Sequence, residues 1–361
     1  EDEKGEVKQW VLDVASLGFK IDYCDYRALE NKDEKVRAYI EEDSSKIFDL
    51  EHGPLLRASL LQIEDEKYVF YFNMHHIISD GWSKGVLSRD VFTFYKSYKA
   101  GIEPDLEELR IQYKDYSAWQ LSQLEEDSFQ VHKDYWLNQL SGELQLLELS
   151  TTKKRPVLKT NNGHTLGTFL SKEVSQKLKK YSQQNGGTLF MGLLSSLTAI
   201  FYRYTSQEDI IIGSPIAGRE HADLENQIGF YVNTLVLRNQ VEKEDSFDSL
   251  FEKVKQTTLD SYSHQMYPFD RLVEDLELQR DTSRSAVFDV MLVLQNTLEK
   301  SKDVEVEQRL VDRIISKGPK TSKFDLLFNV DEQGDYLSFN VEYNTDVYDI
   351  ELIRGFIRHY K

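Results

Sequence analysis

The stretch from Lys67 to Ser83 reads KYVFYFNMHHIISDGWS. Its first part is mostly apolar or aromatic on both alternating faces, which predicts a buried strand over Lys67–Met74. Two histidines, an aspartate and a glycine follow immediately. Proteins that mix strands and helices usually present their catalytic groups in the loops after strands. The stretch therefore predicts an α/β fold with a candidate site in this loop.

Strand and helix signals alternate along the rest of the chain, which supports the mixed α/β class. Ser171 and Thr188 are expected to cap two of the helices, and residues 331–335 to close a hairpin. Helices are predicted over residues 84–99, 113–140 (one or two), 171–183, 188–204, 245–262 and 349–360, and further strands over 165–170, 209–213, 230–238, 286–295, 324–330 and 336–343.

The segment Ser150–Gly163, STTKKRPVLKTNNG, loses the apolar periodicity and contains a proline and an Asn-Asn-Gly turn. It is the best linker in a chain of 361 residues, a length that suits two or three domains or one two-lobed unit. We therefore predict an N-terminal lobe over residues 1–158 and a C-terminal lobe over 159–361, two similar lobes that each mix strands and helices.

Composition excludes several classes of protein. The formal net charge of −18 disfavours a general affinity for nucleic acid or for an anionic membrane. Cys24 is the single cysteine, which excludes an internal disulfide and a multi-cysteine zinc site. No apolar run approaches the roughly 18 residues of a membrane span, and no signal peptide is visible, so we predict a cytoplasmic protein. Because the chain opens on Glu1 and not on Met, we expect it to be processed, excised or incompletely represented.

The histidine cluster has four interpretations. The first is a purely structural turn. The second is a metal site formed by His75, His76 and Asp80. Adjacent residues of a strand point to opposite faces, so both imidazoles reach one ion only if the backbone bends sharply. The remaining histidines are scattered, and we predict no metal site.

The third interpretation is a serine hydrolase, because Gly81–Gly85, GWSKG, matches the G-x-S-x-G pattern of a nucleophile elbow. An acidic residue directly before the elbow is unusual, and no downstream Asp and His partners stand out.

The fourth interpretation is a single histidine that acts as a general base or a positioning group at neutral pH. Strand alternation lets one of His75 and His76 face a cavity while the other packs inward. Asp80 then orients the imidazole or ties down the loop, and Gly81 lets the backbone approach a substrate closely.

Met74–Ser83, MHHIISDGWS, resembles the H-H-x-x-x-D-G core motif of the condensation domains of nonribosomal peptide synthetases, which are related to chloramphenicol acetyltransferase and to carnitine acyltransferases. Further stretches resemble later motifs of that family in the right order, with Asp270 in place of the usual Glu and Ser285-Ala286 in place of the usual Asn-Pro. These stretches are Tyr113–Gln120 (YKDYSAWQ), Ile228–Arg238 (IGFYVNTLVLR), His264–Asp270 (HQMYPFD) and Arg280–Ala286 (RDTSRSA), and Phe48–Arg57 also fits. The first two motifs of the family are absent, so several tens of residues of the first lobe are expected to be missing.

The resemblance implies two chloramphenicol-acetyltransferase-like lobes in a V arrangement, with a central tunnel and the HHxxxDG loop at its centre. His76, Asp80 and Gly81 are then the catalytic residues, and His76 matches the catalytic second His of the family. His75 is a structural support, and Arg219 in a Gly-Arg turn is the expected ion-pair partner of Asp80. The resemblance assigns a tunnel-shaping role to Trp82, Ser83, Asn233, His264 and Arg284.

The activity implied by the resemblance is amide bond formation between a donor acyl or peptidyl thioester and an acceptor aminoacyl thioester. Both substrates are carried on the phosphopantetheine of partner carrier proteins, next to an adenylation domain, and no cofactor of its own is expected. Two alternatives share the fold: an epimerisation domain and a non-catalytic docking module. The order Trp82-Ser83 favours condensation over epimerisation, and docking modules tend to lose the histidine that is kept here. Candidate contacts for the carrier proteins, which are usually acidic, are the basic residues Lys153-Lys154-Arg155, Lys177, Lys179 and Lys180.

Overall fold

The computed structural model describes residues 7–279, 281–295 and 321–361. Contacts between their Cα atoms group the described residues into two compact units. The first unit holds the described chain up to Tyr113 together with Glu225–Tyr231. The second unit holds Lys114–Leu224 and the described residues from Val232 to the end of the chain.

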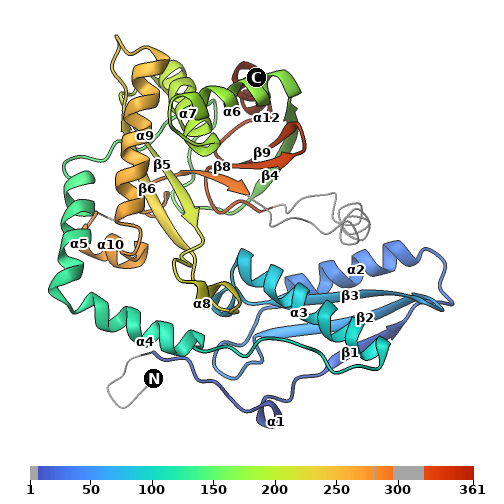
Figure 1. Ribbon diagram of the computed structural model, residues 1–361. Coiled ribbons are helices and arrows are strands. Elements are labelled where there is room, and N and C mark those ends of the chain that lie inside the picture. Colours follow the sequence, from blue (N-terminus) through green and yellow to red (C-terminus); the bar gives the residue numbers. More distant parts are fainter. Residues whose placement is uncertain (1–6, 280, 296–320) are drawn as a thin grey trace. The chain divides into compact units, whose positions relative to one another are not determined.

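The first unit is built on a three-stranded sheet in the order β1-β2-β3 (Figure 1). β1 runs parallel to β2, and β2 and β3 form an antiparallel hairpin. The hairpin ends in the loop that carries the HHxxxDG motif, and α3 leaves from it. The elements of this unit are α1 (Val14–Leu17), β1 (Ile21–Asp25), α2 (Lys32–Ser45), β2 (Leu56–Glu64), β3 (Lys67–Met74), η1 (His76–Ile78) and α3 (Gly81–Ala100).

One face of this sheet carries the small core of the first unit, where Val36 of α2 clusters with Leu61 and Ile63 of β2. β3 has the predicted bounds, but the prediction that it is buried on both faces is wrong. Tyr68 and Phe70 remain 47% and 40% exposed. β3 lies at the edge of the sheet, and the described residues cover its second face only in part.

A buried carboxylate joins α2 to the sheet. Asp43 is 6% exposed. Its Oδ1 accepts from Nε of Arg57 at 2.8 Å, and its Oδ2 accepts from the hydroxyl of Tyr71 at 2.9 Å and from Nδ2 of Asn73 at 3.1 Å. Burial of a carboxylate is tolerated when charge-assisted hydrogen bonds replace its hydration, so this cluster fixes α2 on the hairpin that leads to the motif loop.

The second unit is built on a six-stranded mixed sheet in the order β4-β9-β8-β7-β5-β6. The neighbours β5 and β7, and β7 and β8, are parallel, and the other pairs are antiparallel. The strands are β4 (Gly163–Leu170), β5 (Asp209–Ile216), β6 (Asn233–Gln240), β7 (Val290–Gln295), β8 (Leu326–Gln333) and β9 (Tyr336–Asn344). The helices are α4 (Tyr113–Leu124), α5 (Asp127–Gln139), α6 (Lys172–Gln184), α7 (Leu189–Thr205), α8 (Ala222–Glu225), α9 (Phe247–Ser263), α10 (Phe269–Asp275) and α12 (Ile350–Tyr360). The first residue of α4 and the last residue of α8 belong to the first unit.

The large core of the second unit forms between this sheet and the helices α6, α7, α9 and α12 (Figure 1). α7 places Leu193, Leu197 and Phe201 at a spacing of four residues, and all three are fully buried. The ring of Phe201 lies 5.9 Å from that of Phe328 in β8 and 5.2 Å from that of Phe356 in α12. Full burial of such side chains contributes about 1.5–3 kcal/mol each, so this core stabilises the second unit.

Local sequence signals fix many of these boundaries. Ser171 and Thr188 cap α6 and α7, because their hydroxyls accept from the backbone N–H groups of Val174 and Met191. The predicted hairpin is confirmed between β8 and β9, and Gly334 takes the positive φ of +61° that its turn requires.

One predicted strand begins later than expected. The pattern from Phe230 predicts a strand over residues 230–238, but β6 begins at Asn233. Residues Glu225–Tyr231 belong to the first unit, so their aromatic side chains serve that unit and do not extend β6. The predicted strand over 286–295 is likewise shorter, because β7 begins at Val290.

The boundary between the two units lies elsewhere than the predicted lobe boundary between residues 158 and 159. The second unit begins at Lys114. Phe129 and Trp136 of α5 are buried in its core, and the indole N–H of Trp136 donates to the carbonyl of His264 at 2.9 Å. Long-range packing of α5, which the linker composition does not reveal, therefore assigns this helix to the second unit.

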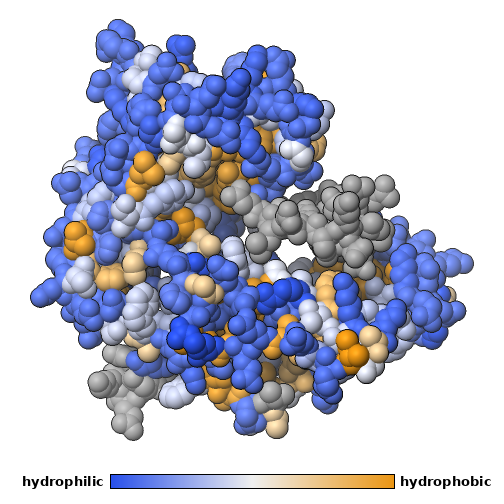
Figure 2. All heavy atoms as spheres, in the orientation of Figure 1, coloured by the Kyte–Doolittle hydropathy of each residue, from blue (hydrophilic) through white to orange (hydrophobic). Residues whose placement is uncertain are grey.

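Hydrophilic residues dominate the face of the molecule that Figure 2 displays, and apolar residues form smaller patches between them. This distribution agrees with the charged fraction of 29%. In the described part of the chain, no helix is both long and apolar enough to cross a membrane.

Candidate active site

The first histidine of the motif is a structural element of the loop after β3. His75 has an extended backbone, and its Nδ1 accepts from the N–H of Ile77 at 3.1 Å, which caps the 3-10 turn η1. Its ring packs edge to face against Phe48 at 5.8 Å. The guanidinium of Arg57 lies 3.9 Å from the centroid of that same phenylalanine ring. His75 is therefore held by packing, and the support role predicted for it stays a prediction.

The second histidine is held differently. His76 is exposed, and its Nδ1 lies 2.6 Å from the carbonyl oxygen of Ser79. A carbonyl oxygen can only accept, so Nδ1 of the neutral ring carries the proton and Nε2 keeps its lone pair. The loop thus presents one imidazole with a basic nitrogen of defined position.

Asp80 ties this loop to α3. It is 3% exposed and caps the helix, because its Oδ1 accepts from the N–H of Ser83 at 2.7 Å. Its Oδ2 accepts from the N–H of Tyr231 at 3.1 Å. The charge of Asp80 also acts on Tyr113, whose pKa is raised mainly by burial and further by this charge. These contacts support a loop-holding role for Asp80.

Arg219, the predicted partner of Asp80, lies in the second unit and donates to the carbonyl of Leu224 there. Because the two residues belong to different units, their ion pair stays a prediction, as does the central tunnel.

Gly81 is the first residue of α3 and is exposed. A Cβ built on it meets no atom within 4 Å. The fold itself therefore leaves space for a side chain at this position, and the catalytic role of Gly81 stays a prediction.

Ser83 is not available as a nucleophile. Its side chain is fully buried in the first turn of α3. The hydroxyl lies within hydrogen-bonding distance of Asp80 at 2.7 Å and of the carbonyl of Gly229 at 2.9 Å, and it accepts from the N–H of Gly229 at 3.1 Å. This environment argues against the serine hydrolase interpretation, because a nucleophile elbow needs an exposed hydroxyl.

A segment from the second half of the chain completes this part of the first unit, and sequence reasoning missed its role. The ring of Phe230 packs edge to face on His76 at 5.2 Å. The indole N–H of Trp82 donates to the carbonyl of Glu225 at 2.8 Å, and Nε2 of Gln227 donates to that of Ile111 at 2.8 Å. The sequence signal for this segment is the motif over Ile228–Arg238, whose aromatic residues have the pattern of a strand.

Asn233 has a structural role at the start of β6. Its amide Nδ2 donates to the carbonyls of Gln265 and Tyr267, both at 2.8 Å. Its Oδ1 accepts from the N–H groups of Thr234 at 2.8 Å and of Phe269 at 3.0 Å. These four bonds use both donors and both acceptor positions of the amide, and they join β6 to the start of α10.

His264 also packs within the second unit. Its Nδ1 lies 3.0 Å from Nδ1 of His132, and its ring stacks on Tyr135 at 4.1 Å. One of the two nitrogens must carry a proton and the other must accept it. This histidine pair therefore joins α5 to the end of α9.

Arg284 lies in the last predicted motif, of which Arg280 falls outside the described residues. Its side chain is 9% exposed. It donates to Asp289 at 2.9 Å and pairs with Glu148. These ion pairs hold the loop before β7, so the structure gives Arg284 a structural role in the second unit.

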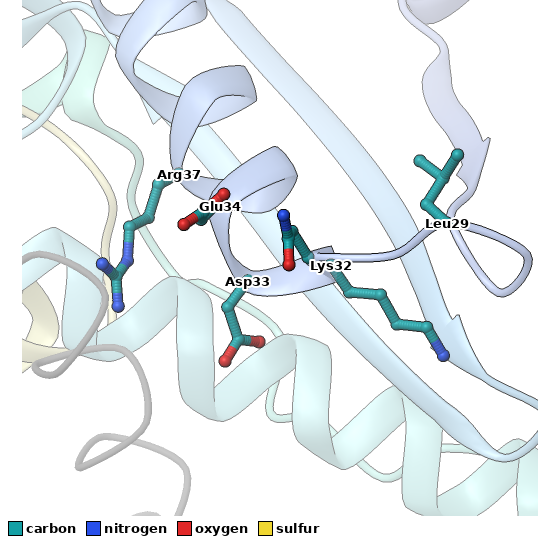
Figure 3. Close-up of a pocket in the computed structure, with 6 residues that line it drawn as sticks. Leu29, Lys32, Asp33, Glu34 and Arg37 are labelled. Carbon is teal, nitrogen blue, oxygen red and sulfur yellow. The ribbon is translucent and has the colours of Figure 1, made fainter.

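No group of three or more metal-binding side chains lies together in the part of the chain that the structure describes. A surface hollow at the start of α2 is lined by Leu29, Asn31, Lys32, Asp33, Glu34 and Arg37. Figure 3 shows the side chains of Lys32 and Arg37 extending to opposite sides. None of the predicted site residues lines this hollow.

Residues 1–361 match the sequence model of the condensation domain. The chain therefore belongs to the condensation domain family of nonribosomal peptide synthetases. Condensation domains of these synthetases act on substrates tethered to the phosphopantetheine of carrier proteins and use no cofactor of their own.

Two bacterial synthetases illustrate the relationship. The chain is 39% identical over 345 residues to one of the linear gramicidin synthase proteins of Brevibacillus parabrevis, a match that covers 96% of this chain and 4% of that protein. It is 39% identical over 313 residues to bacitracin synthase 3 of Bacillus licheniformis, which covers 87% of this chain and 5% of that protein. The chain thus spans a small part of each relative's length, and such relatives place the family in the synthesis of peptide antibiotics.

Solved structures show the same fold. The X-domain from teicoplanin biosynthesis aligns with a TM-score of 0.81 at 21% identity, over 94% of this chain and 77% of that one. The first condensation domain of the CDA synthetase aligns with a TM-score of 0.72 at 17% identity, over 95% of this chain and 75% of that one. The fold is thus the mixed α/β fold of chloramphenicol-acetyltransferase-like proteins.

Proposed function

We propose that this chain forms an amide bond between a donor acyl or peptidyl thioester and an acceptor aminoacyl thioester, with His76 as the group that handles the amine proton. The observation that carries the proposal is the 2.6 Å contact from Nδ1 of His76 to the carbonyl of Ser79. It fixes the tautomer whose Nε2 is basic, on an exposed side chain. Membership of the condensation domain family supplies the reaction class.

The proposed reaction needs little more than positioning and one proton acceptor. The neutral α-amine of the acceptor attacks the donor carbonyl, a C–N bond forms and the C–S bond breaks. Nε2 of His76 takes one amine proton and returns it to the departing sulfur, so atoms and charges balance. Holding two tethered substrates in line lowers the barrier further.

The other two predicted catalytic residues act around this histidine. Asp80 holds the loop through its cap on α3 and its bond to Tyr231. The N-terminus of α3 begins at Gly81, and the first backbone N–H groups of a helix favour negative charge. We assign to these N–H groups the stabilisation of the oxyanion that develops on the thioester carbonyl.

The partners in this proposal are a donor and an acceptor peptidyl carrier protein, together with an adjacent adenylation domain. No nucleic acid and no membrane take part, and the location is the cytoplasm, as predicted from the sequence. The family relatives support this setting, since they are synthetases far longer than the chain.

A non-catalytic docking module is the second candidate, because the X-domain from teicoplanin biosynthesis, which has also been solved in a complex with OxyB, has the same fold. His76 argues against it, since docking modules tend to lose this residue. An epimerisation domain is the third, and the order Trp82-Ser83 argues against it.

One assay separates the three candidates. The intact polypeptide that carries this domain is mixed with a donor carrier and an acceptor carrier, both loaded, and the products of a single turnover are released and analysed for length and chirality. A lengthened product supports condensation. Inversion of the donor without lengthening supports epimerisation, and an unchanged donor supports a docking module.

A further inference from the structure

His76 has a neighbour that has no assigned role. The rings of His76 and Phe230 lie 5.2 Å apart at an angle of 71°, an edge-to-face contact. The hydrogen bond to Ser79 holds only one edge of the imidazole. A single bond at Nδ1 fixes the tautomer but leaves the ring free to tilt about that point. A second contact is needed to hold the direction in which Nε2 points.

The backbone on both sides of Phe230 is fixed to the first unit. The buried hydroxyl of Ser83 lies 2.9 Å from the carbonyl oxygen of Gly229 and 3.1 Å from its N–H nitrogen. The carbonyl of Phe230 accepts from the hydroxyl of Tyr113 at 3.1 Å, and the N–H of Tyr231 donates to Asp80 at 3.1 Å. The backbone of three successive residues is therefore held, which fixes the direction of the Cα–Cβ bond of Phe230.

Gly229 reinforces this placement. A Cβ at this position would lie 2.3 Å from the ring of Tyr113 and 2.8 Å from that of Tyr231. The two tyrosine rings themselves meet edge to face at 5.2 Å. Only a glycine lets the segment approach closely enough for Phe230 to reach the imidazole.

We propose that Phe230 is a positioning residue for His76, and that Ser83 acts on the reaction by holding Phe230 in place. This inference rests on the proposed function of His76. Phe230 is 40% exposed, so its replacement is expected to leave the fold intact. In the reaction it sets the angle at which Nε2 meets the acceptor amine.

The first test measures the imidazole directly and needs no activity. In protein labelled with ¹⁵N-histidine, the His76 signals, assigned with His76→Ala, are expected to report one tautomer with Nδ1 protonated. Phe230→Ala is expected to move both ¹⁵N shifts toward the average of the two tautomers, because a tilting ring loses its bond to Ser79 for part of the time. Phe230→Tyr is expected to restore the wild-type values. Unchanged shifts in Phe230→Ala would overturn the proposal.

The second test measures single-turnover condensation in the intact polypeptide. A small misplacement of a catalytic group costs up to about 10²-fold, so Phe230→Ala is expected to lower the maximal rate roughly 10- to 100-fold with an unchanged half-saturating carrier concentration. Phe92→Ala is the matched control, because Phe92 lies in the same unit and is 38% exposed. A loss that depends on the donor side chain would instead make Phe230 a specificity residue and contradict the proposal.

A double-variant comparison tests the role of Ser83. If Ser83 acts through Phe230, Ser83→Ala combined with Phe230→Ala is expected to be no slower than the slower single variant. Multiplied losses would show that Ser83 acts independently. If the wild-type chain forms no amide, the proposed function fails, whereas the ¹⁵N measurement still decides the role of Phe230.

Discussion

The Nδ1 atom of His76 and the carbonyl oxygen of Ser79 lie 2.6 Å apart, within one short loop. The next residue, Asp80, caps α3. The same loop therefore sets the tautomer of the imidazole and starts a helix whose first N–H groups favour negative charge. This local arrangement underlies the first prediction.

Replacing His76 by alanine is expected to leave the fold intact and to remove most condensation activity. General acid–base catalysis contributes about 10²–10⁴-fold, so a residual rate from substrate positioning is expected. Single-turnover condensation and thermal melting measure the two effects. His52→Ala is the control, because His52 lies in the same unit and its side chain is 73% exposed. Wild-type rates in His76→Ala would remove His76 from the mechanism.

Replacing Asp80 by alanine is expected to lower both stability and activity, because it removes a helix cap and the bond to Tyr231. Loss of a cap alone costs about 0.5–2 kcal/mol, and an ion pair with Arg219 would raise the cost to about 3–5 kcal/mol. Asp80→Asn is expected to be milder, since it keeps the shape and some hydrogen bonds. Urea unfolding measures the difference.

The matched control for Asp80 is Ser171→Ala, which removes the cap of α6 in the second unit. It is expected to cost stability without changing the condensation rate. If Asp80→Ala unfolds like the wild type and loses only activity, Asp80 acts directly in catalysis and the loop-holding role is wrong.

Asp43 is expected to make the first unit sensitive to acid. Burial opposes its ionisation, but hydrogen bonds from Asn73, Tyr71 and Arg57 outweigh burial and lower the pKa of Asp43. The pKa in the unfolded chain is about 3.9. The ionised carboxylate therefore contributes stability above about pH 4, and this contribution is lost as the pH falls through the lower folded-state pKa.

Asp43→Asn is expected to unfold about 1–3 kcal/mol more easily at pH 7, because buried donors lose a charged acceptor. Its stability is also expected to fall less steeply than that of the wild type below about pH 4. Urea unfolding between pH 3 and pH 7 measures both. Parallel curves for the two proteins at acid pH would contradict the assignment.

His132 in the second unit is expected to make stability depend on pH near neutrality. The pKa of His132 is lowered mainly by burial and further by the neighbouring His264. An unfolded histidine titrates near pH 6.5. Neutral His132 therefore contributes stability above about pH 6.5, which is lost as the pH falls through the folded-state pKa.

His132→Gln is expected to weaken this dependence, since glutamine keeps a polar group but does not titrate. The difference between wild type and variant is expected to reach at most about 1.4 kcal/mol per pH unit. Urea unfolding at pH 7.5, 6.5 and 5.5 measures it. Other groups near the pair are Tyr135, which stacks on His264, and the ion pair of Lys133 with Asp275. Equal slopes would contradict the lowered pKa of His132 as the cause of this pH dependence.

Ser83 is expected to resist active-site serine reagents such as fluorophosphonates, because its hydroxyl is fully buried and hydrogen-bonded. Intact-mass spectrometry after labelling of the native protein measures this. Stoichiometric labelling at Ser83, absent in Ser83→Ala, would revive the hydrolase interpretation.

Several of the basic residues predicted to contact carrier proteins have acidic partners within the second unit. Lys177 pairs with Glu173 at 2.7 Å, and Lys179 pairs with Glu332 at 2.6 Å. Arg155 is 19% exposed and pairs with Asp325. These pairings reduce the positive charge that is available to an acidic partner.

The sequence by itself determined β3, the motif loop after it and the starts of α6 and α7. β3 has the predicted bounds, and the caps of α6 and α7 fall on the predicted residues. These features depend on local signals, namely alternation, helical periodicity and capping residues within a few positions. The tautomer of His76 is equally local, because its partner is three residues away.

Only the tertiary structure decided what surrounds that histidine. Ser83 and Gly229, which hold the backbone next to Phe230, are 146 positions apart. The histidine pair of the second unit also depends on a long-range contact, because His132 and His264 are 132 positions apart. The aromatic run at Phe230 has the pattern of a strand, but its residues pack within the first unit, and β6 begins only at Asn233. Such contacts depend on which surfaces meet after folding, and no periodicity within one segment encodes them.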